Sequence, residues 1–354
     1  MKKHNFSAGP SILPDSVMQQ ASAAVQELDG IGLSLIEISH RSKEFIAIMD
    51  RAQKLALELT GLEGKGYQAL FLQGGASTQF LMTAMNLMKS KAGYINTGAW
   101  SDKAIKEAKR YGEVIEIASS KEKNFNYIPK GAQIPADLDY LHLTTNNTIF
   151  GTQFHTLPDT NVPLIADMSS DIFSRELDYA AFDLFYAGAQ KNMGSAGTTL
   201  VIVKDSLLEK MNDNVPSMMS YAVHAAKGSM FNTPPVFPVY TSMLTLEWLK
   251  EQGGIKAIQK HNEAKAKLVY YEIDRNTAFI GFAAKEDRSF MNATFNLADG
   301  VDGAAFDALW TAADISGIKG HRDVGGYRAS IYNALPLKSV QLLVDIMQQF
   351  EKTI

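Results

Sequence analysis

Apolar residues recur at helical spacing in the first part of the chain. Residues 42–60 give the clearest pattern, with one apolar face at a 3.6-residue period made of Phe45, Ile46, Met49, Ala52, Leu55, Ala56 and Leu59. This pattern predicts an amphipathic helix. Residues 14–28 predict another helix, with Asp15 and Ser16 near its start.

Short apolar runs then replace the helical period. They predict strands over 69–72, 93–96, 114–117, 140–143, 163–166, 184–187 and 199–203, and helices over 78–88 and 101–111, the second capped by Ser101. Strands of this kind, some alternating with helices, indicate an α/β fold with a large, mostly parallel sheet covered on both faces. Such sheets carry their chemistry at the carboxyl ends of the strands.

A second α/β unit is predicted after Gly253-Gly254. The expected elements are a helix over 255–275, a strand near 290–296, a helix near 303–313, a strand near 327–333 and a helix near 337–351. We expect a large domain over residues 15–258 and a smaller domain made of residues 1–14 and 259–354. The polar run 119–126 is predicted to be a solvated loop.

Composition narrows the class of protein. The 354 residues are 46% hydrophobic, enough for a large core, and a net charge of −4 argues against a nucleic-acid-binding protein. Cysteine is absent, which excludes disulfides and cysteine nucleophiles, and the seven histidines show no metal-ligand spacing, so no metal is expected. No apolar run approaches the ~18 residues of a membrane span and no signal peptide is recognisable; we expect a soluble, cytoplasmic protein.

Lys191 is the first candidate for catalysis. It follows the apolar strand predicted over 184–187 and stands in a Gly-rich turn, residues 188–194. A lysine after a strand is usually a solvated strand end, but a desolvated lysine has a lowered pKa, so that its neutral amine can form a Schiff base. We therefore hypothesise that Lys191 holds pyridoxal 5'-phosphate (PLP) covalently.

Asp167 is the candidate partner of this lysine. It ends the apolar strand predicted over 163–166 and precedes Lys191 by about one crossover unit, so both would stand at the same edge of the sheet. A helix cap or turn residue is the ordinary interpretation. The functional one is a carboxylate that keeps the pyridine nitrogen of PLP protonated and the ring an electron sink.

Two strand-to-helix junctions suit the rest of such a cofactor. Residues 74–78 (Gly-Gly-Ala-Ser-Thr) open a helix whose free N–H groups could bind a phosphate, although an ordinary βα turn looks the same. Trp100 stands at the next junction and is either a core side chain or a flat surface for a cofactor ring.

Basic residues near glycines suggest anion recognition. His321, Arg322 and Arg328 lie in a Gly-rich segment, and His40-Arg41 is a similar pair near the N-terminus. Surface arginines are common and usually without function, but guanidinium groups match carboxylates and phosphates in shape.

Several motifs together resemble the phosphoserine aminotransferase family, a branch of the class V PLP-dependent aminotransferases with the fold-type-I architecture. The matches run nearly end to end: residues 6–10 (Phe-Ser-Ala-Gly-Pro), 39–41 (Ser-His-Arg), 187–192 (Ala-Gly-Ala-Gln-Lys-Asn), 230–235 (Met-Phe-Asn-Thr-Pro-Pro), 319–322 (Lys-Gly-His-Arg) and 328–333 (Arg-Ala-Ser-Ile-Tyr-Asn). Their number and order make the resemblance specific.

The resemblance implies a role for each candidate residue. Lys191 would carry one PLP per subunit and move the proton, Asp167 would pair with the ring nitrogen, and Trp100 would stack on the ring. Thr148 and Gln190 would contact the cofactor, and Ala76 and Ser77 its phosphate. Asn232 and Thr233 would reach the phosphate in the other subunit of a homodimer with shared active sites. Arg328 would bind the substrate α-carboxylate. The anionic group at the other end of the substrate would be bound by His40, Arg41, His321 and Arg322.

The implied reaction is the reversible transamination of 3-phosphohydroxypyruvate with L-glutamate in serine biosynthesis, on small-molecule substrates and without nucleic acid or membrane. Some family members also aminate a phosphorylated hydroxythreonine precursor in pyridoxine biosynthesis. Two departures affect substrate affinity: Ser77 and Ala8 stand where some members have arginine and serine.

Two alternatives stay open. One is another class V aminotransferase of the alanine–glyoxylate type, which would not need the His321-Arg322 pair. The other is a non-catalytic α/β binding protein, which would leave the pairing of Lys191 and Asp167 unexplained. A cysteine desulfurase is excluded, because the chain has no cysteine.

Overall fold

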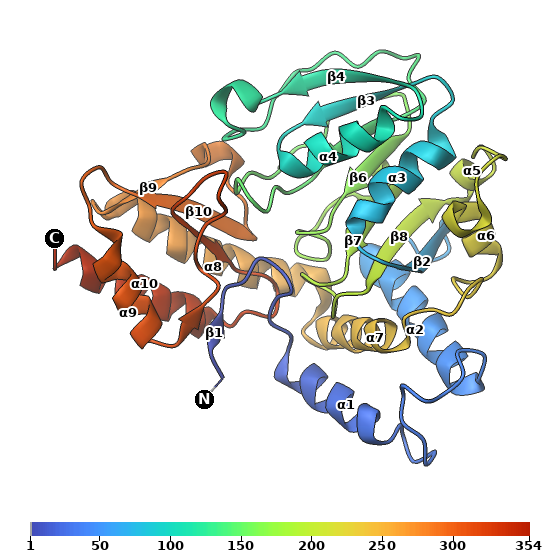
Figure 1. Ribbon diagram of the computed structural model, residues 1–354, viewed down its shortest axis with the longest axis horizontal. Coiled ribbons are helices and arrows are strands. Elements are labelled where there is room, and N and C mark those ends of the chain that lie inside the picture. Colours follow the sequence, from blue (N-terminus) through green and yellow to red (C-terminus); the bar gives the residue numbers. More distant parts are fainter. Residues whose placement is uncertain (1) are drawn as a thin grey trace.

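Seven strands form the central sheet of the computed structural model, which describes residues 2–354 (Figure 1). Their order across the sheet is β2-β8-β7-β6-β5-β3-β4. The bounds are β2 Tyr67–Gln73, β3 Lys91–Asn96, β4 Glu113–Ser119, β5 Leu141–Thr144, β6 Leu164–Asp167, β7 Leu184–Gly188 and β8 Thr198–Lys204. Only β8 runs against its neighbours, β2 and β7, while the remaining pairs are parallel. The prediction of a mostly parallel sheet is confirmed.

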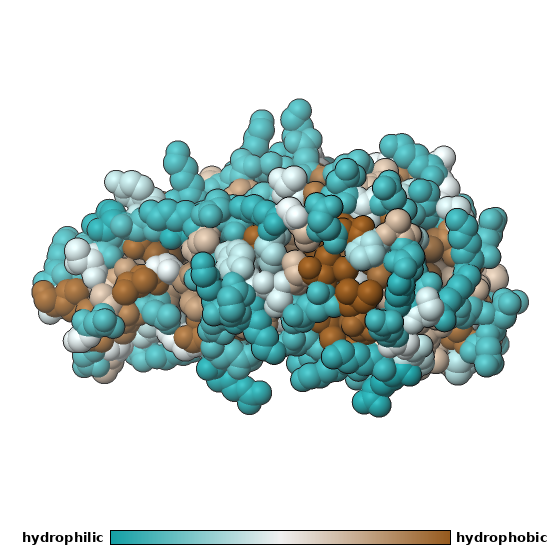
Figure 2. All heavy atoms as spheres, turned by 90° about the horizontal axis from the view of Figure 1, so that it is seen from above, coloured by the Kyte–Doolittle hydropathy of each residue, from teal (hydrophilic) through white to brown (hydrophobic). Residues whose placement is uncertain are grey.

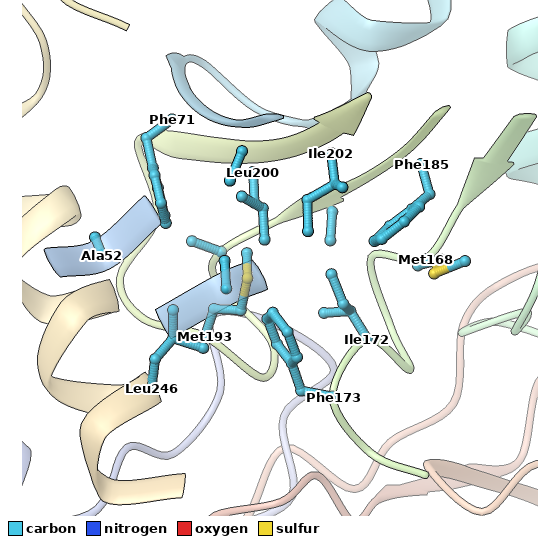
Figure 3. Close-up of a cluster of buried hydrophobic side chains, with 14 of the residues drawn as sticks. Ala52, Phe71, Met168, Ile172, Phe173, Phe185, Met193, Leu200, Ile202 and Leu246 are labelled. Atoms are coloured by element: carbon cyan, nitrogen blue, oxygen red, sulfur yellow. The ribbon is translucent and has the colours of Figure 1, made fainter. Parts of the chain in front are cut away.

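Helices cover both faces of this sheet because its side chains alternate. Phe71, Leu141 and Phe185 pack into one cluster with α1 Asp15–Gln26, α2 Lys43–Thr60 and α7 Val236–Glu251. Figure 3 shows Phe71 and Phe185 in this cluster. Leu70, Tyr140 and Tyr186, their neighbours in sequence, pack on the opposite face with α3 Ala76–Leu87, α4 Ala99–Ala108, α5 Asp205–Leu208 and α6 Tyr221–Ala226. The carboxyl ends of the strands therefore meet at an edge that the helices leave accessible.

A smaller sheet of order β12-β10-β9 follows in the C-terminal part. Its antiparallel strands are β9 Phe279–Gly281, β10 Asn292–Leu297 and β12 Tyr327–Ser330, and its helices are α8 Gly254–Arg275, α9 Gly303–Ala312 and α10 Leu337–Glu351. The N-terminal strand β1 His4–Asn5 lies here too, parallel to β11 Ile315–Ser316 (Figure 1). Short 3-10 turns occur at Lys121–Lys123, Tyr179–Ala181, Ser217–Met219 and Lys285–Asp287.

Helix α8 belongs to both parts of the molecule. Ile255 and Ile258 join the core of the large sheet, whereas Ala266, Val269 and Ile273 join the core of the small sheet. The division of the chain at residue 258 stays a prediction.

Some predicted elements need correction. Ser101 does not cap α4, which begins at Ala99; its buried hydroxyl lies 3.1 Å from that of Thr144 instead. Helix α3 begins at Ala76, two residues before the predicted start, and β12 ends at Ser330 rather than at residue 333. Helix α7 was not predicted.

The surface is mainly hydrophilic with local apolar areas. Figure 2, which views the molecule from the side of β4, shows brown areas between the charged side chains. Val114, Ile115 and Ile117 on the edge strand β4 are only half-buried. Among residues 2–354, no helix has the length and apolar character that crossing a membrane would require.

Candidate active site

A pocket at the carboxyl ends of β5, β6 and β7 collects seven of the predicted site residues: Ala76, Ser77, Trp100, Thr148, Asp167, Gln190 and Lys191. The rest of its lining is made of Gly75, Phe80, Thr144, Asn146, Ser169 and Ser170. The strand order explains this gathering, because adjacent parallel strands deliver their terminal residues to one edge.

Lys191 lies in the turn after β7 with only 9% of its surface exposed. Its Nζ donates a hydrogen bond of 2.7 Å to Thr148 Oγ1. Burial lowers the pKa of Lys191 to about 8, although the carboxylate of Asp167 acts in the opposite direction; Arg328 adds to the lowering. A lysine with this pKa has a substantial neutral fraction at physiological pH and is a competent nucleophile toward an aldehyde.

Asp167 is the last residue of β6 and is buried. The backbone N–H and the hydroxyl of Ser169 both donate to Oδ1 of Asp167, at 2.9 and 2.6 Å. Burial raises the pKa of Asp167, while the Ser169 hydrogen bonds and Lys191 favour the charged form. No donor within residues 2–354 bonds Oδ2, so this oxygen can accept a hydrogen bond from a protonated ring nitrogen.

The start of helix α3 has the features of an anion site. Its N-cap is Gly75, no side chain caps it, and its first turn has no acidic residue. Gly74 has φ +96°, a left-handed conformation that lets the chain turn from β2 into α3. The first-turn N–H groups at Ala76 and Ser77 have no intrahelical partner and can therefore bind a phosphate.

Trp100, in the first turn of α4, forms another side of the pocket. The centre of its ring lies 6.0 Å from Lys191 Nζ. Its buried Nε1 has no hydrogen-bond partner among the described residues. An aromatic cofactor held between this ring and Asp167 fits the arrangement, and its polar substituents could satisfy the indole N–H.

Arg328, on β12 of the small sheet, does not line the pocket but lies next to it, in contact with Thr148. Its Nη1 donates to the carbonyl oxygen of Thr148 at 3.2 Å, while its buried Nε has no partner in the part of the chain that the structure describes. Burial lowers the pKa of Arg328, yet the group stays charged because its ordinary pKa is so high. A half-buried guanidinium near Lys191, with its Nε donor unbonded among the described residues, suits a carboxylate ligand.

The N-terminal segment closes on the lysine from outside. Ser11 N–H donates to the carbonyl oxygen of Gln190 at 2.9 Å, and Tyr332 Oη donates to that of Ala8 at 2.8 Å. A side chain at Gly9 would meet Lys191 Cγ at 3.3 Å. This explains why a small residue is needed at Gly9.

Besides Arg328, six predicted residues do not line the pocket. His40 and Arg41 precede α2; Asn232 and Thr233 precede α7, where the Thr233 carbonyl accepts from Gln73. Arg322 points into solvent with 92% of its side chain exposed, and His321 lies 3.4 Å from Asp323. Val324, in the loop of His321 and Arg322, packs in a cluster with Phe150 and Trp100, so this loop adjoins the pocket wall.

Sequence reasoning missed four polar lining residues: Thr144, Asn146, Ser169 and Ser170. Thr144 ends β5, and Ser169 and Ser170 lie two and three residues after the end of β6. Their position after strand ends was the available signal, but a turn with Ser and Asn is also an ordinary loop.

Comparisons with known proteins agree with this geometry. The family model of class V aminotransferases matches residues 3–343. The phosphoserine aminotransferases of Flavobacterium johnsoniae and Bacteroides fragilis are 62% and 53% identical to this chain, over 100% and 99% of both chains.

Solved structures are similar along the whole chain. The phosphoserine aminotransferase of Bacillus circulans subsp. alkalophilus is 43% identical with a TM-score of 0.96, over 99% of both chains. The PLP-bound enzyme of Trichomonas vaginalis is 34% identical with a TM-score of 0.92, over 98% of this chain and 100% of that one. An alanine–glyoxylate aminotransferase from Nostoc shares the fold, at 19% identity and a TM-score of 0.73.

Proposed function

This chain belongs to the class V aminotransferase family, and on that premise we propose that it transfers an amino group reversibly between L-glutamate and 3-phosphohydroxypyruvate. The products are O-phospho-L-serine and 2-oxoglutarate, in serine biosynthesis. PLP is the cofactor. The observation that carries the proposal is the meeting of Lys191 and Asp167 in one pocket, in a chain with full-length likeness to phosphoserine aminotransferases.

Each pocket residue has a proposed task in holding PLP. The first-turn N–H groups at Ala76 and Ser77 bind the phosphate, Trp100 covers one face of the ring, and Asp167 Oδ2 keeps the proton on the ring nitrogen. Thr148 and Gln190 complete the contacts. When bound, the protonated ring supplies an electron sink that stabilises negative charge at the substrate α-carbon.

Lys191 and Arg328 act on the substrate. Arg328 holds the α-carboxylate as a two-pronged donor, which fixes the α-carbon within reach of Lys191 Nζ. Lys191 Nζ then removes the proton from the substrate α-carbon and holds it for its return. The hydroxyl of Thr148, which accepts from Nζ, limits the directions in which this amine can point.

The distal anion site is proposed to need a second copy of the chain. His40, Arg41, His321 and Arg322 lie outside the pocket lining, and the exposed Arg322 is free to extend. We place Asn232 and Thr233 against the cofactor phosphate of the partner, in a cytoplasmic homodimer. Ser77 in place of an arginine leaves this distal site with one fewer fixed charge. Use of the pyridoxine-pathway substrate stays a prediction.

Borohydride reduction of the purified yellow protein tests the assignment of Lys191. Mass spectrometry should find the reduced cofactor on the peptide that contains Lys191, and a Lys191→Ala variant should carry no label. The half-buried Lys204, whose Nζ lies 3.7 Å from Asp183, serves as an internal control and should stay unlabelled. Label on another lysine would refute the assignment, and a colourless protein would favour a non-catalytic binding protein.

Substrate exchange tests the reaction itself. Added O-phosphoserine should convert the cofactor spectrum in a single turnover, and 3-phosphohydroxypyruvate should accumulate. Conversion by alanine with glyoxylate as acceptor, and none by phosphoserine, would favour the alanine–glyoxylate type.

A further inference from the structure

Three buried asparagines meet at one turn behind the pocket. Asn192, Asn262 and Asn333 are 6%, 1% and 3% exposed. They come from three separate segments: the turn of Lys191, helix α8, and the connection between β12 and α10. Nothing in the reaction proposed above uses them.

Their amides bond three successive carbonyl groups. Asn192 Nδ2 donates to the oxygen of Ile172 at 3.3 Å, Asn333 Nδ2 to that of Phe173 at 3.0 Å, and Asn262 Nδ2 to that of Ser174 at 2.9 Å. The asparagines also bond one another. Asn262 Nδ2 donates to Asn333 Oδ1 at 2.8 Å, and Asn333 N–H donates to Asn192 Oδ1 at 3.1 Å. The result is a closed network around residues 172–174.

The turn at its centre has an unfavourable backbone conformation. Phe173 has φ +57°, in the left-handed region that a large side chain rarely adopts. Its ring is completely buried and lies among Ile172 and Met193 in the core of the large sheet (Figure 3). Such a conformation persists only where the surroundings enforce it, and the three amides supply that enforcement.

Three of the four segments that the network connects carry one proposed group of the active site each, and the fourth is helix α8. Residues 172–174 follow Asp167 in the chain, and Asn192 is next to Lys191. Asn333 lies just after strand β12, which carries Arg328. The network therefore links the ring-nitrogen carboxylate, the lysine and the substrate arginine, although these groups belong to two different sheets. Helix α8 contributes the third asparagine and packs into both cores.

We propose that Asn192, Asn262 and Asn333 form a positioning cluster, which fixes Asp167, Lys191 and Arg328 relative to one another across the two sheets. This inference rests on the proposed function. None of the three asparagines touches substrate or cofactor in this proposal; they act through the turn. Loss of one amide should let the turn relax and shift the pocket groups by a fraction of an ångström, which catalysis tolerates poorly.

Asn262→Ala and Asn333→Ala test the cluster, with Asn276→Ala as the matched control. Asn276 is also a buried amide, at the end of α8, but it bonds Glu272, Met347 and Ala278 in the small core. Three quantities are measured for each variant: the melting temperature, the pH at which the absorbance of bound PLP changes, and kcat and KM for both amino acids. PLP affinity of the cofactor-free protein gives a readout independent of turnover.

The cluster variants should lose at least about 10-fold in kcat for phosphoserine and for glutamate. The pH of the absorbance change should move by about half a pH unit or more, because Lys191 and Asp167 no longer keep their spacing. Asn276→Ala should match their loss of melting temperature and leave both other quantities unaltered. A double variant should lose less than the product of the single losses, since both amides support one turn.

If the cluster variants lose only melting temperature, as the control does, the asparagines are structural and the proposal is wrong. Should either alanine variant fail to fold, Asn262→Ser and Asn333→Ser give the same comparison with a smaller cavity. A wild type that binds PLP but rejects phosphoserine would overturn only the proposed function, because the absorbance change still tests the cluster. A wild type that binds no PLP would overturn both.

Discussion

At the scale of single residues, the state of Lys191 decides how the protein takes up its cofactor. The amine must be neutral to attack the aldehyde, and burial lowers the pKa of Lys191 to about 8. Below that pH the lysine of the cofactor-free protein is mostly protonated and slow to react, and above it mostly neutral. The rate constant of PLP recombination should therefore rise with pH and reach half its plateau near pH 8, as stopped-flow absorbance would record. A half-point close to 10.5, the ordinary value for lysine, would contradict the effect of burial.

Asp167→Asn keeps the shape of the carboxylate and removes its charge. The protein should still bind PLP and stay coloured, since Lys191 is intact, but half-reaction rates should fall by at least about 100-fold because the ring nitrogen loses its ionic partner. The recombination half-point should also move below pH 8, because Asp167 raises the pKa of Lys191 more than Asp171, the other carboxylate that does so. Rapid-reaction spectra measure both. Near-normal half-reactions would remove Asp167 from the mechanism.

Arg322 and Arg328 should differ in which substrate they serve. Arg322→Ala should reduce kcat/KM for phosphoserine by an amount that corresponds to roughly 2–4 kcal/mol of transition-state stabilisation, the scale of truncating a desolvated charge pair. The reduction for glutamate should be smaller. Arg328→Ala should damage both half-reactions alike, because the two substrates share the α-carboxylate. Steady-state kinetics with each amino acid provide the comparison. Equal losses in Arg322→Ala would refute its part in phosphate selectivity, and so would no loss, since an arginine exposed in a monomer usually contributes little.

At the scale of elements, the start of α3 is the proposed binding site of the cofactor phosphate. Ser77→Asp should weaken PLP binding at least about 100-fold, because a carboxylate would stand beside the phosphate. Ser77→Ala removes a hydroxyl without adding charge and should cost far less. Equilibrium titrations of the cofactor-free protein measure both. Pyridoxal, which has no phosphate, should bind wild type and Ser77→Asp alike; a large loss with pyridoxal would mean that the substitution disturbs the fold.

The elements that the sequence predicted are those with a clear period or apolar run. Helix α7 was missed because it is apolar on most sides and contains Thr241, Ser242 and Thr245, which usually favour other structures. In the structure these hydroxyls bond carbonyls of their own helix, Pro238 and Thr241, so the helix is buried without unpaired donors. Ser101 was wrongly predicted to cap a helix, because its hydroxyl is hydrogen-bonded to that of Thr144 and not to the start of α4.

The pocket residues could be predicted only where they directly follow a strand that the sequence itself indicates. Lys191 and Asp167 follow apolar strands, and the parallel sheet brings strand ends together without further information. The role of Thr148 and the α-carboxylate role of Arg328 came from resemblance alone, because their contact joins the large sheet to β12 of the small one. No local pattern indicates how two sheets pack. The asparagine network was invisible for the same reason, since its members are 70 or more residues apart.

At the scale of the whole molecule, the proposed sharing of active sites in a homodimer predicts complementation between inactive subunits. Lys191→Ala subunits and Asn232→Ala/Thr233→Ala subunits should each be nearly inactive. After subunit exchange, mixed dimers would contain one intact site, and the mixture should recover roughly a quarter of wild-type activity. Enzyme assays before and after mixing provide the measurement. With exchange verified by mass spectrometry, no gain over the parents would contradict shared sites.

The N-terminal segment also ties the completion of the pocket to protein synthesis. His4 pairs with Ile315, while the residues just after this strand lie against Gln190 and Lys191. On the ribosome, the first strand must wait for a partner translated some 310 residues later, on the order of tens of seconds at ordinary elongation rates. A nascent chain stalled before residue 315 can build much of the large sheet, but its lysine lacks the final cover. Cofactor capture should therefore follow release of the chain, and free PLP should offer little help to a ribosome-bound intermediate.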